Sequence, residues 1–312
     1  MLRPIGALIL ATYMPFCTPA IRPTMAPDQA QRRMGELWSA PTSLTSSDLM
    51  FGPWGEEHAP NPRAVYSFVH AKTAGVSPGL TVADPKGREW SVKQGPEGPV
   101  EVVVSRILSA VGYRQPPVYY LTRFTLRDDR GTHVAPGGRF RPKIDDLKEV
   151  GEWSFQQNPF VGTKPFEGLL VILMVFDSSD LKNSNNSLYA LKHAGADATR
   201  WFVVRDLGTA LGETGRLDPR RNDPDLFDRN RFITSVHDGF VTFDYQGWHQ
   251  ELFRKRITPD DVKWACDLMA GLTDKQWHDA FTAGGYDPPT ADRFIAIVKR
   301  RVEQGRALAV RR

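Results

Sequence analysis

The sequence predicts an α+β protein with two lobes: a small β-rich lobe towards the N-terminus and a larger, mainly helical lobe towards the C-terminus. Short β-prone runs separated by turn formers fill residues 64–136, with one helical pattern among them. Helix starts recur after residue 250 instead, at Thr258-Pro259, Thr273-Asp274 and Pro289-Thr290. With 41% apolar and 24% charged residues, the chain of 312 residues has the composition of a globular protein.

The N-terminal residues have the pattern of a secretory signal. Arg3 precedes an apolar segment, residues 5–16, and small residues follow up to Ala20. That segment is too short to span a membrane. We therefore expect residues 1–26 to be a signal peptide cleaved after Ala20 or Ala26, which predicts a periplasmic or secreted protein. A frayed N-terminal helix of a cytoplasmic protein is the alternative.

Residues 27–63 are rich in Pro, Ser, Thr and Gly and are expected to form an extension ahead of the first lobe. Residues 64–136 form that lobe, with strands expected at residues 65–69, 80–82, 90–93, 118–121 and 124–126. In the strand at 90–93, Ser91 and Lys93 alternate with apolar residues and so share one face. A small residue two positions before a lysine leaves room for a ligand at that lysine.

A helix is expected at residues 99–111, because Pro99 suits a first turn and apolar residues recur at helical spacing up to Gly112. At 100° per residue, Glu101 lies at the edge of the apolar stripe. We expect Glu101 to pair with Lys93. Glu97 is the competing carboxylate, nearer in sequence but expected to precede the helix.

Residues 137–168 are rich in turn formers and are expected to connect the lobes, and residues 169–312 are expected to form the larger lobe. The larger lobe begins with an apolar run, residues 169–176, that suits a buried helix. Two β-prone runs follow at residues 187–191 and 201–205. The charged stretch at 212–231 is either a solvated loop or the segment that binds an acceptor.

The polar residues around these runs supply the parts of a phosphoryl-transfer site. Asp180, Lys182 and Asn185 lie in one hexapeptide, and Asp206 opens an Asp-Leu-Gly tripeptide 26 residues after Asp180. A carboxylate can orient or deprotonate an attacking hydroxyl group. The amide oxygen of Asn185 and the carboxylate of Asp206 are hard oxygen ligands of the kind that Mg²⁺ prefers.

These motifs resemble those of the protein kinase-like superfamily. Asp180, Lys182 and Asn185 match its catalytic loop, Asp206 matches its metal-binding aspartate, and Lys93 matches its phosphate-binding lysine. The resemblance implies a two-lobed kinase-like fold with ATP and Mg²⁺ as cofactors. Lys93, held by Glu101, would position the α- and β-phosphates. Asn185 and Asp206 would bind the metal, and Asp180 and Lys182 would be the catalytic residues.

The chain departs from the family pattern in three places, which indicates a divergent, atypical branch. No G-x-G-x-x-G precedes Lys93, and residues 72–79 are the nearest substitute. Ser178-Ser179 replaces the usual His-Arg before the catalytic aspartate, and no A-P-E follows Gly208.

Two functions remain open at this point. One is an ATP-dependent phosphotransferase whose acceptor is an unknown protein, lipid or small molecule. The other is a non-catalytic kinase-like binding or scaffold protein of the cell envelope, which export would favour because ATP is scarce outside the cytoplasm. Nucleic acid is not an expected partner, because the basic residues behind the net charge of +4 are scattered. The seven histidines show no zinc-binding spacing.

Overall fold

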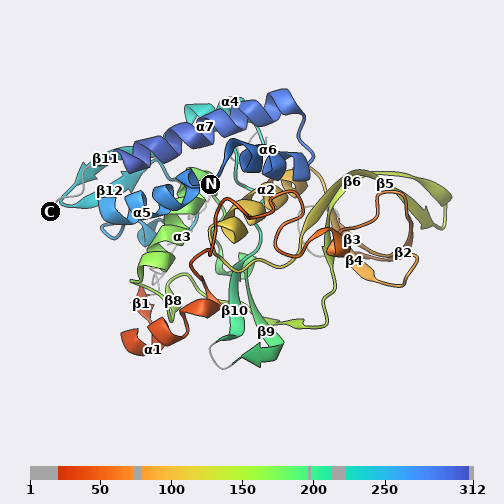
Figure 1. The fold of residues 1–312 in the computed structure, drawn as a ribbon, viewed down its shortest axis with the longest axis horizontal. Coiled ribbons are helices and arrows are strands. Elements are labelled where there is room, and N and C mark those ends of the chain that lie inside the picture. The colour runs from red at the N-terminus through yellow and green to blue at the C-terminus, as the bar shows by residue number, and fades with distance from the viewer. Residues whose placement is uncertain (1–19, 73–78, 196–197, 213–221, 309–312) are drawn as a thin grey trace, which may run out of the picture.

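The computed structural model describes residues 20–72, 79–195, 198–212 and 222–308 of the chain. It is an α+β protein with a β-rich N-terminal part and a helical C-terminal part, which lie at opposite ends of Figure 1. Residues 1–19, which hold most of the expected signal peptide, lie outside the described residues. No helix among the described residues is long and apolar enough to span a membrane.

The β-rich part is a closed barrel with the strand order β2-β3-β4-β6-β5. In chain order these strands are β2 (Val65–Lys72), β3 (Gly79–Ala83), β4 (Glu89–Gln94), β5 (Tyr119–Asp128) and β6 (Gly131–Pro142). Neighbours are antiparallel except β2 and β5, whose short parallel pairing closes the barrel. Aromatic side chains fill the interior, where Phe140 contacts Tyr66, Trp90 and Phe124 at ring-centroid distances of 5.1 to 6.0 Å.

Strand β6 corrects the boundary expected at residue 136, because it continues to Pro142. Gly137 and Gly138 suggest a turn in the sequence, but they lie within the strand, where the backbone is crowded. A Cβ at Gly137 would lie 2.6 Å from the carbonyl oxygen of Thr122, and one at Gly138 would lie 2.7 Å from a Val92 methyl group. These glycines permit close packing. Residues 118–121 and 124–126 are expected to form two strands, but the single strand β5, Tyr119–Asp128, runs through both.

Helix α2 (Glu97–Ala110) packs between the barrel and the helical part (Figure 1). It begins two residues earlier than expected, so Glu97 lies in its first turn and not before it. The helix ends at Ala110, one residue before the expected end, and Gly112 follows with a φ of 104° that few other residues adopt. Its apolar side chains, such as Val103 and Ile107, belong to the same hydrophobic cluster as those of the C-terminal helices.

The residues after the barrel form a small sheet and a buried helix. The sheet has the order β10-β9-β7, with β7 (Leu147–Gly151), β9 (Asn186–Gly195) and β10 (Ala198–Val204). Helix α3 (Lys164–Val175) is the buried helix expected from the apolar run, and Thr163 caps its N-terminus. The β9–β10 hairpin accounts for the long interval between Asp180 and Asp206.

The helical part contains α4 (Pro224–Arg229), α5 (Pro259–Ala270), α6 (Asp274–Ala283) and α7 (Pro288–Arg306). The expected helix starts are confirmed to within one residue. Thr258 and Thr273 each form a capping box, and Asp287 caps α7. The sequence did not indicate the hairpin of β11 (Ile233–His237) and β12 (Phe240–Phe243) that lies between α4 and α5.

The segment before the barrel is packed against both parts. It contains α1 (Pro27–Arg32), the short helices η1 (Met34–Glu36) and η2 (Glu56–His58), and strand β1 (Arg22–Pro23), which pairs in parallel with β8 (Gln157–Asn158). Trp38 donates a hydrogen bond to the Val111 carbonyl at 2.8 Å, and its ring lies 5.4 Å from the ring of Trp264. The expected extension is therefore part of the folded core.

Candidate functional site

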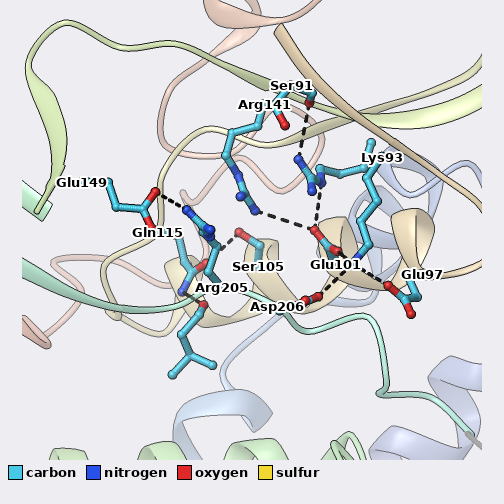
Figure 2. A network of polar contacts seen from close by, with 12 residues as sticks. Ser91, Lys93, Glu97, Glu101, Ser105, Gln115, Arg141, Glu149, Arg205 and Asp206 are labelled. Atoms are coloured by element: carbon cyan, nitrogen blue, oxygen red, sulfur yellow. Dashed lines mark hydrogen bonds and ion pairs between the residues drawn. The ribbon is translucent and has the colours of Figure 1, made fainter. Parts of the chain in front are cut away.

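The charged centre of the site is the ammonium group of Lys93, which strand β4 directs at the first turns of α2 (Figure 2). Its Nζ donates to Glu101 Oε1 at 2.6 Å and to Asp206 Oδ1 at 2.9 Å. It also pairs with Glu97. The structure thus brings Lys93 and Asp206 together from positions 113 residues apart, and both carboxylates considered from the sequence contact the lysine.

Glu101 is the buried carboxylate of this cluster, with 2% of its side chain exposed. One oxygen contacts Lys93, and the other lies 2.8 Å from Arg139 Nε and 3.6 Å from Arg141. Burial alone would raise the pKa of Glu101. The three cations outweigh it and lower that pKa to about 2, so the carboxylate is ionised at neutral pH.

The strand register explains why so many cations meet here. Lys93 lies opposite Arg139 in the β4–β6 pair, and Ser91 lies opposite Arg141. Like charges directly opposite one another destabilise a sheet, and Glu101 offsets this repulsion from the adjacent helix. Arg139 and Arg141 are not among the site residues expected from the sequence, because the turn formers in residues 137–168 predict a connection there. The alternation of Arg139, Phe140 and Arg141 was the available signal for a strand.

Backbone contacts join the catalytic-loop motif to the segment that carries Asp206. The Asn185 carbonyl accepts hydrogen bonds from the amides of Arg205 and Asp206 at 3.1 and 3.3 Å. The Asp180 amide donates to the Thr209 hydroxyl group at 3.2 Å. Asp180, Asn185, Asp206 and Lys93 therefore lie in one connected site, although no contact joins the Asp180 and Asp206 carboxylates among the described residues. The structure leaves their chemical roles as predictions.

Two further side chains border Asp180. Lys182 Nζ lies 2.8 Å from Asp180 Oδ1 and 5.0 Å from the centre of the Trp248 ring. Tyr245 donates a hydrogen bond to the Trp248 carbonyl at 2.6 Å, and its hydroxyl group also lies 3.1 Å from the Ser179 carbonyl. Burial, followed by the nearby carboxylates, raises the pKa of Tyr245, so its hydroxyl group stays protonated. Neither aromatic residue was singled out from the sequence.

Two groups of oxygen donors can be compared as sites for a hard divalent cation: the three carboxylates around Lys93, and the side chains of Asp206 and Asn185. Glu97, Glu101 and Asp206 offer oxygens within 4.8 Å of one another, but the Lys93 ammonium group already contacts all three and acts as their cation. Asp206 keeps 46% of its side chain exposed. The Asn185 side chain donates from Nδ2 to the Asp180 carbonyl at 2.7 Å, which orients its amide. The half-exposed carboxylate of Asp206 and the side-chain oxygen of Asn185 are hard donors of the kind that Mg²⁺ prefers.

Gly208 has a steric role in bringing Asp206 to the helix. A Cβ at this position would lie 2.5 Å from the Cβ of Glu97 and 3.3 Å from its Cα. Real Cβ atoms do not approach so closely. The glycine of the Asp-Leu-Gly tripeptide thus lets the Asp206 segment pass against the start of α2.

A pocket with a cavity volume of about 390 Å³ lies beside this cluster, between the barrel and the β7–β9–β10 sheet. Lys72, Ser91, Arg139 and Arg141 line it on the barrel side, and Glu149 and Arg205 line it on the sheet side. Residues 73–78, in the loop proposed as a phosphate-binding substitute, lie outside the described residues, as do residues 213–221 of the charged stretch.

Comparison with known proteins gives a distant similarity to a solved structure. No family model matches the chain, and no curated protein matches it. Among solved structures, the chain is similar to the Helicobacter pylori proinflammatory kinase CtkA, with 12% sequence identity and a TM-score of 0.35. The similar region covers 78% of this chain and 99% of that one.

Proposed function

We propose that this protein is a kinase-like phosphotransferase that binds ATP with Mg²⁺ and transfers the γ-phosphoryl group to a hydroxyl acceptor. The observation that carries the proposal is the position of Lys93, whose ammonium group contacts both Glu101 and Asp206. A lysine held by a buried, ionised carboxylate is preorganised to bind phosphate oxygens. Asp206 lies beside it, on the segment that is hydrogen-bonded to Asn185.

Each residue of the site has a role in this proposal. Lys93 binds phosphate oxygens, and Glu101 fixes its position. Asp206 and Asn185 hold Mg²⁺, which neutralises phosphate charge when bound. Asp180 accepts the proton of the acceptor hydroxyl group as that oxygen bonds to the γ-phosphorus and the bond to the β-phosphate oxygen breaks. Lys182, 2.8 Å from Asp180, stabilises negative charge near the transferred group.

The location of the protein belongs to the same proposal. We propose that the chain is exported, on the pattern of its first twenty residues. The acceptor is then a hydroxyl group of a protein, lipid or small molecule in the same compartment, and the donor must be supplied there.

Two isosteric variants test the chemistry. Asp206→Asn removes a carboxylate from the metal site, so we expect Mg²⁺-dependent ATP binding and turnover to fall together. Asp180→Asn removes the proton acceptor, so we expect ATP affinity within about threefold of the unmutated protein but turnover reduced by at least about 100-fold. Affinity is measured by titration calorimetry, and turnover is measured as phosphate transfer or ATP hydrolysis in the same samples.

Asp129→Asn, in an exposed turn of the barrel, is the matched control and should change neither quantity. If the unmutated protein binds no nucleotide with any divalent cation, the proposed function is wrong. If it binds ATP without turnover and Asp180→Asn changes nothing, the non-catalytic binding protein is the better account.

A further inference from the structure

The pocket beside Glu101 carries more positive than negative charge. Five cationic side chains are among the described residues that line it: Lys72, Arg139, Arg141, Lys143 and Arg205. Two carboxylates line it as well, and each already has a partner, since Glu89 lies 3.7 Å from Lys143 and Glu149 pairs with Arg205. Lys72, Arg139 and Arg141 therefore have no carboxylate of their own in the lining.

Glu101, behind the pocket, does not remove this excess. Lys93 has Glu97 and Asp206 as further partners. Among the described residues, Glu101 is the one carboxylate shared by Arg139 and Arg141, and its contact with Arg141 is long at 3.6 Å. The Arg139 and Arg141 side chains are only 7% and 16% exposed, so water screens them poorly.

Arg141 is the clearest sign of the excess charge. Its Nε is buried and has no hydrogen-bond partner among the described residues. Burial, and then the neighbouring Arg139 and Arg205, lower the pKa of its guanidinium group to about 9. Figure 2 shows this guanidinium group between Glu101 and Arg205. A buried donor without a partner is costly and is expected to have one in the functional state.

Lys72, on the same barrel side of the pocket, is affected by the same charges. Its ammonium group donates a hydrogen bond to the Ser91 hydroxyl group at 2.5 Å. Burial lowers its pKa, and Arg139, Arg141 and Arg205 lower it further. Lys72, Arg139 and Arg141 thus surround the position of Ser91, opposite Arg141 in the β4–β6 pair.

We propose that this pocket is a binding site for a phosphate group, held by Arg141, Arg139 and Lys72. A phosphate carries two negative charges and enough terminal oxygens for two guanidinium groups and an ammonium group. A neutral base could stack on a guanidinium face, but it would leave the charge uncompensated. The inference goes beyond the proposed function, because it assigns a phosphate to the pocket on the far side of Glu101 from Lys93.

The test uses tripolyphosphate, inorganic phosphate and adenosine as probes, in EDTA and at low salt. We expect tripolyphosphate to raise the melting temperature, inorganic phosphate to raise it less, and adenosine to leave it unchanged. Arg141→Met should weaken tripolyphosphate binding at least tenfold without lowering the melting temperature of the free protein, because it removes a buried charge that Glu101, 3.6 Å away, compensates only in part. A structural role would instead lower that temperature.

Lys72→Met is the second variant, because Lys72 is exposed at a strand end and its replacement should leave folding intact. It should also weaken tripolyphosphate binding. Arg130→Met, at an exposed turn of the same barrel, is the charge-matched control and should bind as the unmutated protein does. The proposal is overturned if tripolyphosphate gives no stabilisation, if both pocket variants bind it normally, or if adenosine stabilises the protein as much as tripolyphosphate does.

Asp206→Asn separates this proposal from the proposed function. It should abolish Mg²⁺-dependent ATP binding but retain tripolyphosphate binding in EDTA. Loss of tripolyphosphate binding in Arg141→Met with normal Mg²⁺-ATP binding would support the pocket alone. If the unmutated protein binds Mg²⁺-ATP normally but does not bind tripolyphosphate, the proposed phosphate site is wrong. The proposed function would not be affected by that result.

Discussion

At the scale of single residues, Glu101 organises the site. It is the carboxylate that Lys93, Arg139 and Arg141 share, and its burial strengthens each of these interactions. Losing it would leave several buried cations without compensation, which is far more costly than losing an exposed ion pair.

We predict that Glu101 makes the free energy of unfolding decrease as the pH falls below about 5. Its pKa is about 2 in the folded protein against an ordinary value of 4.5, so its stabilisation is fully present above about pH 5. It is lost as the pH falls from there to about 2, and the difference amounts to roughly 3 kcal/mol. Urea unfolding of the unmutated protein and of Glu101→Gln between pH 7 and pH 3 measures it.

Glu101→Gln should be less stable at pH 7 by about 3–5 kcal/mol, because it breaks a buried pair, and its stability should change less with pH. Glu152→Gln replaces an exposed carboxylate and is the control, with a pH profile like that of the unmutated protein. If the stability of Glu101→Gln and that of the unmutated protein change in parallel with pH, Glu101 is not the source of the pH dependence.

At the scale of elements, the sequence predicted the parts with a strong periodic pattern. The buried helix α3, the strand of Lys93 and the capped helices α5 and α6 were expected, because apolar spacing and capping residues are local signals. Strand β6 was missed, because Gly137 and Gly138 serve close packing that only the folded barrel reveals. The partner of Lys93 stayed open between Glu97 and Glu101, and the early start of α2 lets both contact it.

We predict that Gly208 is required for the Asp206 segment to pack against α2. Gly208→Ala would bring a Cβ within 2.5 Å of the Glu97 Cβ, so one of the two segments must move. We expect a loss of about 1–3 kcal/mol in unfolding free energy, together with weaker Mg²⁺-dependent nucleotide binding. Chemical denaturation and calorimetry measure the two effects.

Gly35→Ala is the matched control, because its Cβ would meet no atom nearer than 3.8 Å. It should be neutral within about 0.5 kcal/mol. Glu97→Gly removes the opposing Cβ, so the double variant with Gly208→Ala should be more stable than the sum of the two single changes indicates. Strict additivity would show that the two residues do not collide.

At the scale of the whole molecule, the segment before the barrel joins the two parts. Gln276 of α6 donates hydrogen bonds to the carbonyls of Leu44 and Ser47, and Glu36 accepts hydrogen bonds from Thr199 in β10. Apolar residues of this segment belong to the large hydrophobic cluster that α2 shares with the C-terminal helices. Sequence composition could not predict this, because the segment has no regular period and its partners lie up to 232 residues away.

Backbone contacts near the N-terminus favour cleavage after Ala20 over cleavage after Ala26, the two positions that the sequence left open. The Arg22 amide donates to the Gln156 carbonyl at 2.9 Å, and the Thr24 amide donates to the Asn158 carbonyl at 3.1 Å. Ile21 packs against the large hydrophobic cluster. Cleavage after Ala26 would remove all three contacts, whereas cleavage after Ala20 would keep them.

For the proposed export, we therefore predict a mature protein that begins at Ile21. A recombinant chain that begins at Ile21 should unfold like the longer chain, and one that begins at Pro27 should be less stable by roughly 2 kcal/mol, from two backbone hydrogen bonds and a partly buried apolar side chain. Intact-mass measurement on protein from its native host identifies the first residue directly. A mass that starts at Pro27 would refute the choice of site, and a mass that retains Met1 or Leu2 would refute export through a cleaved leader.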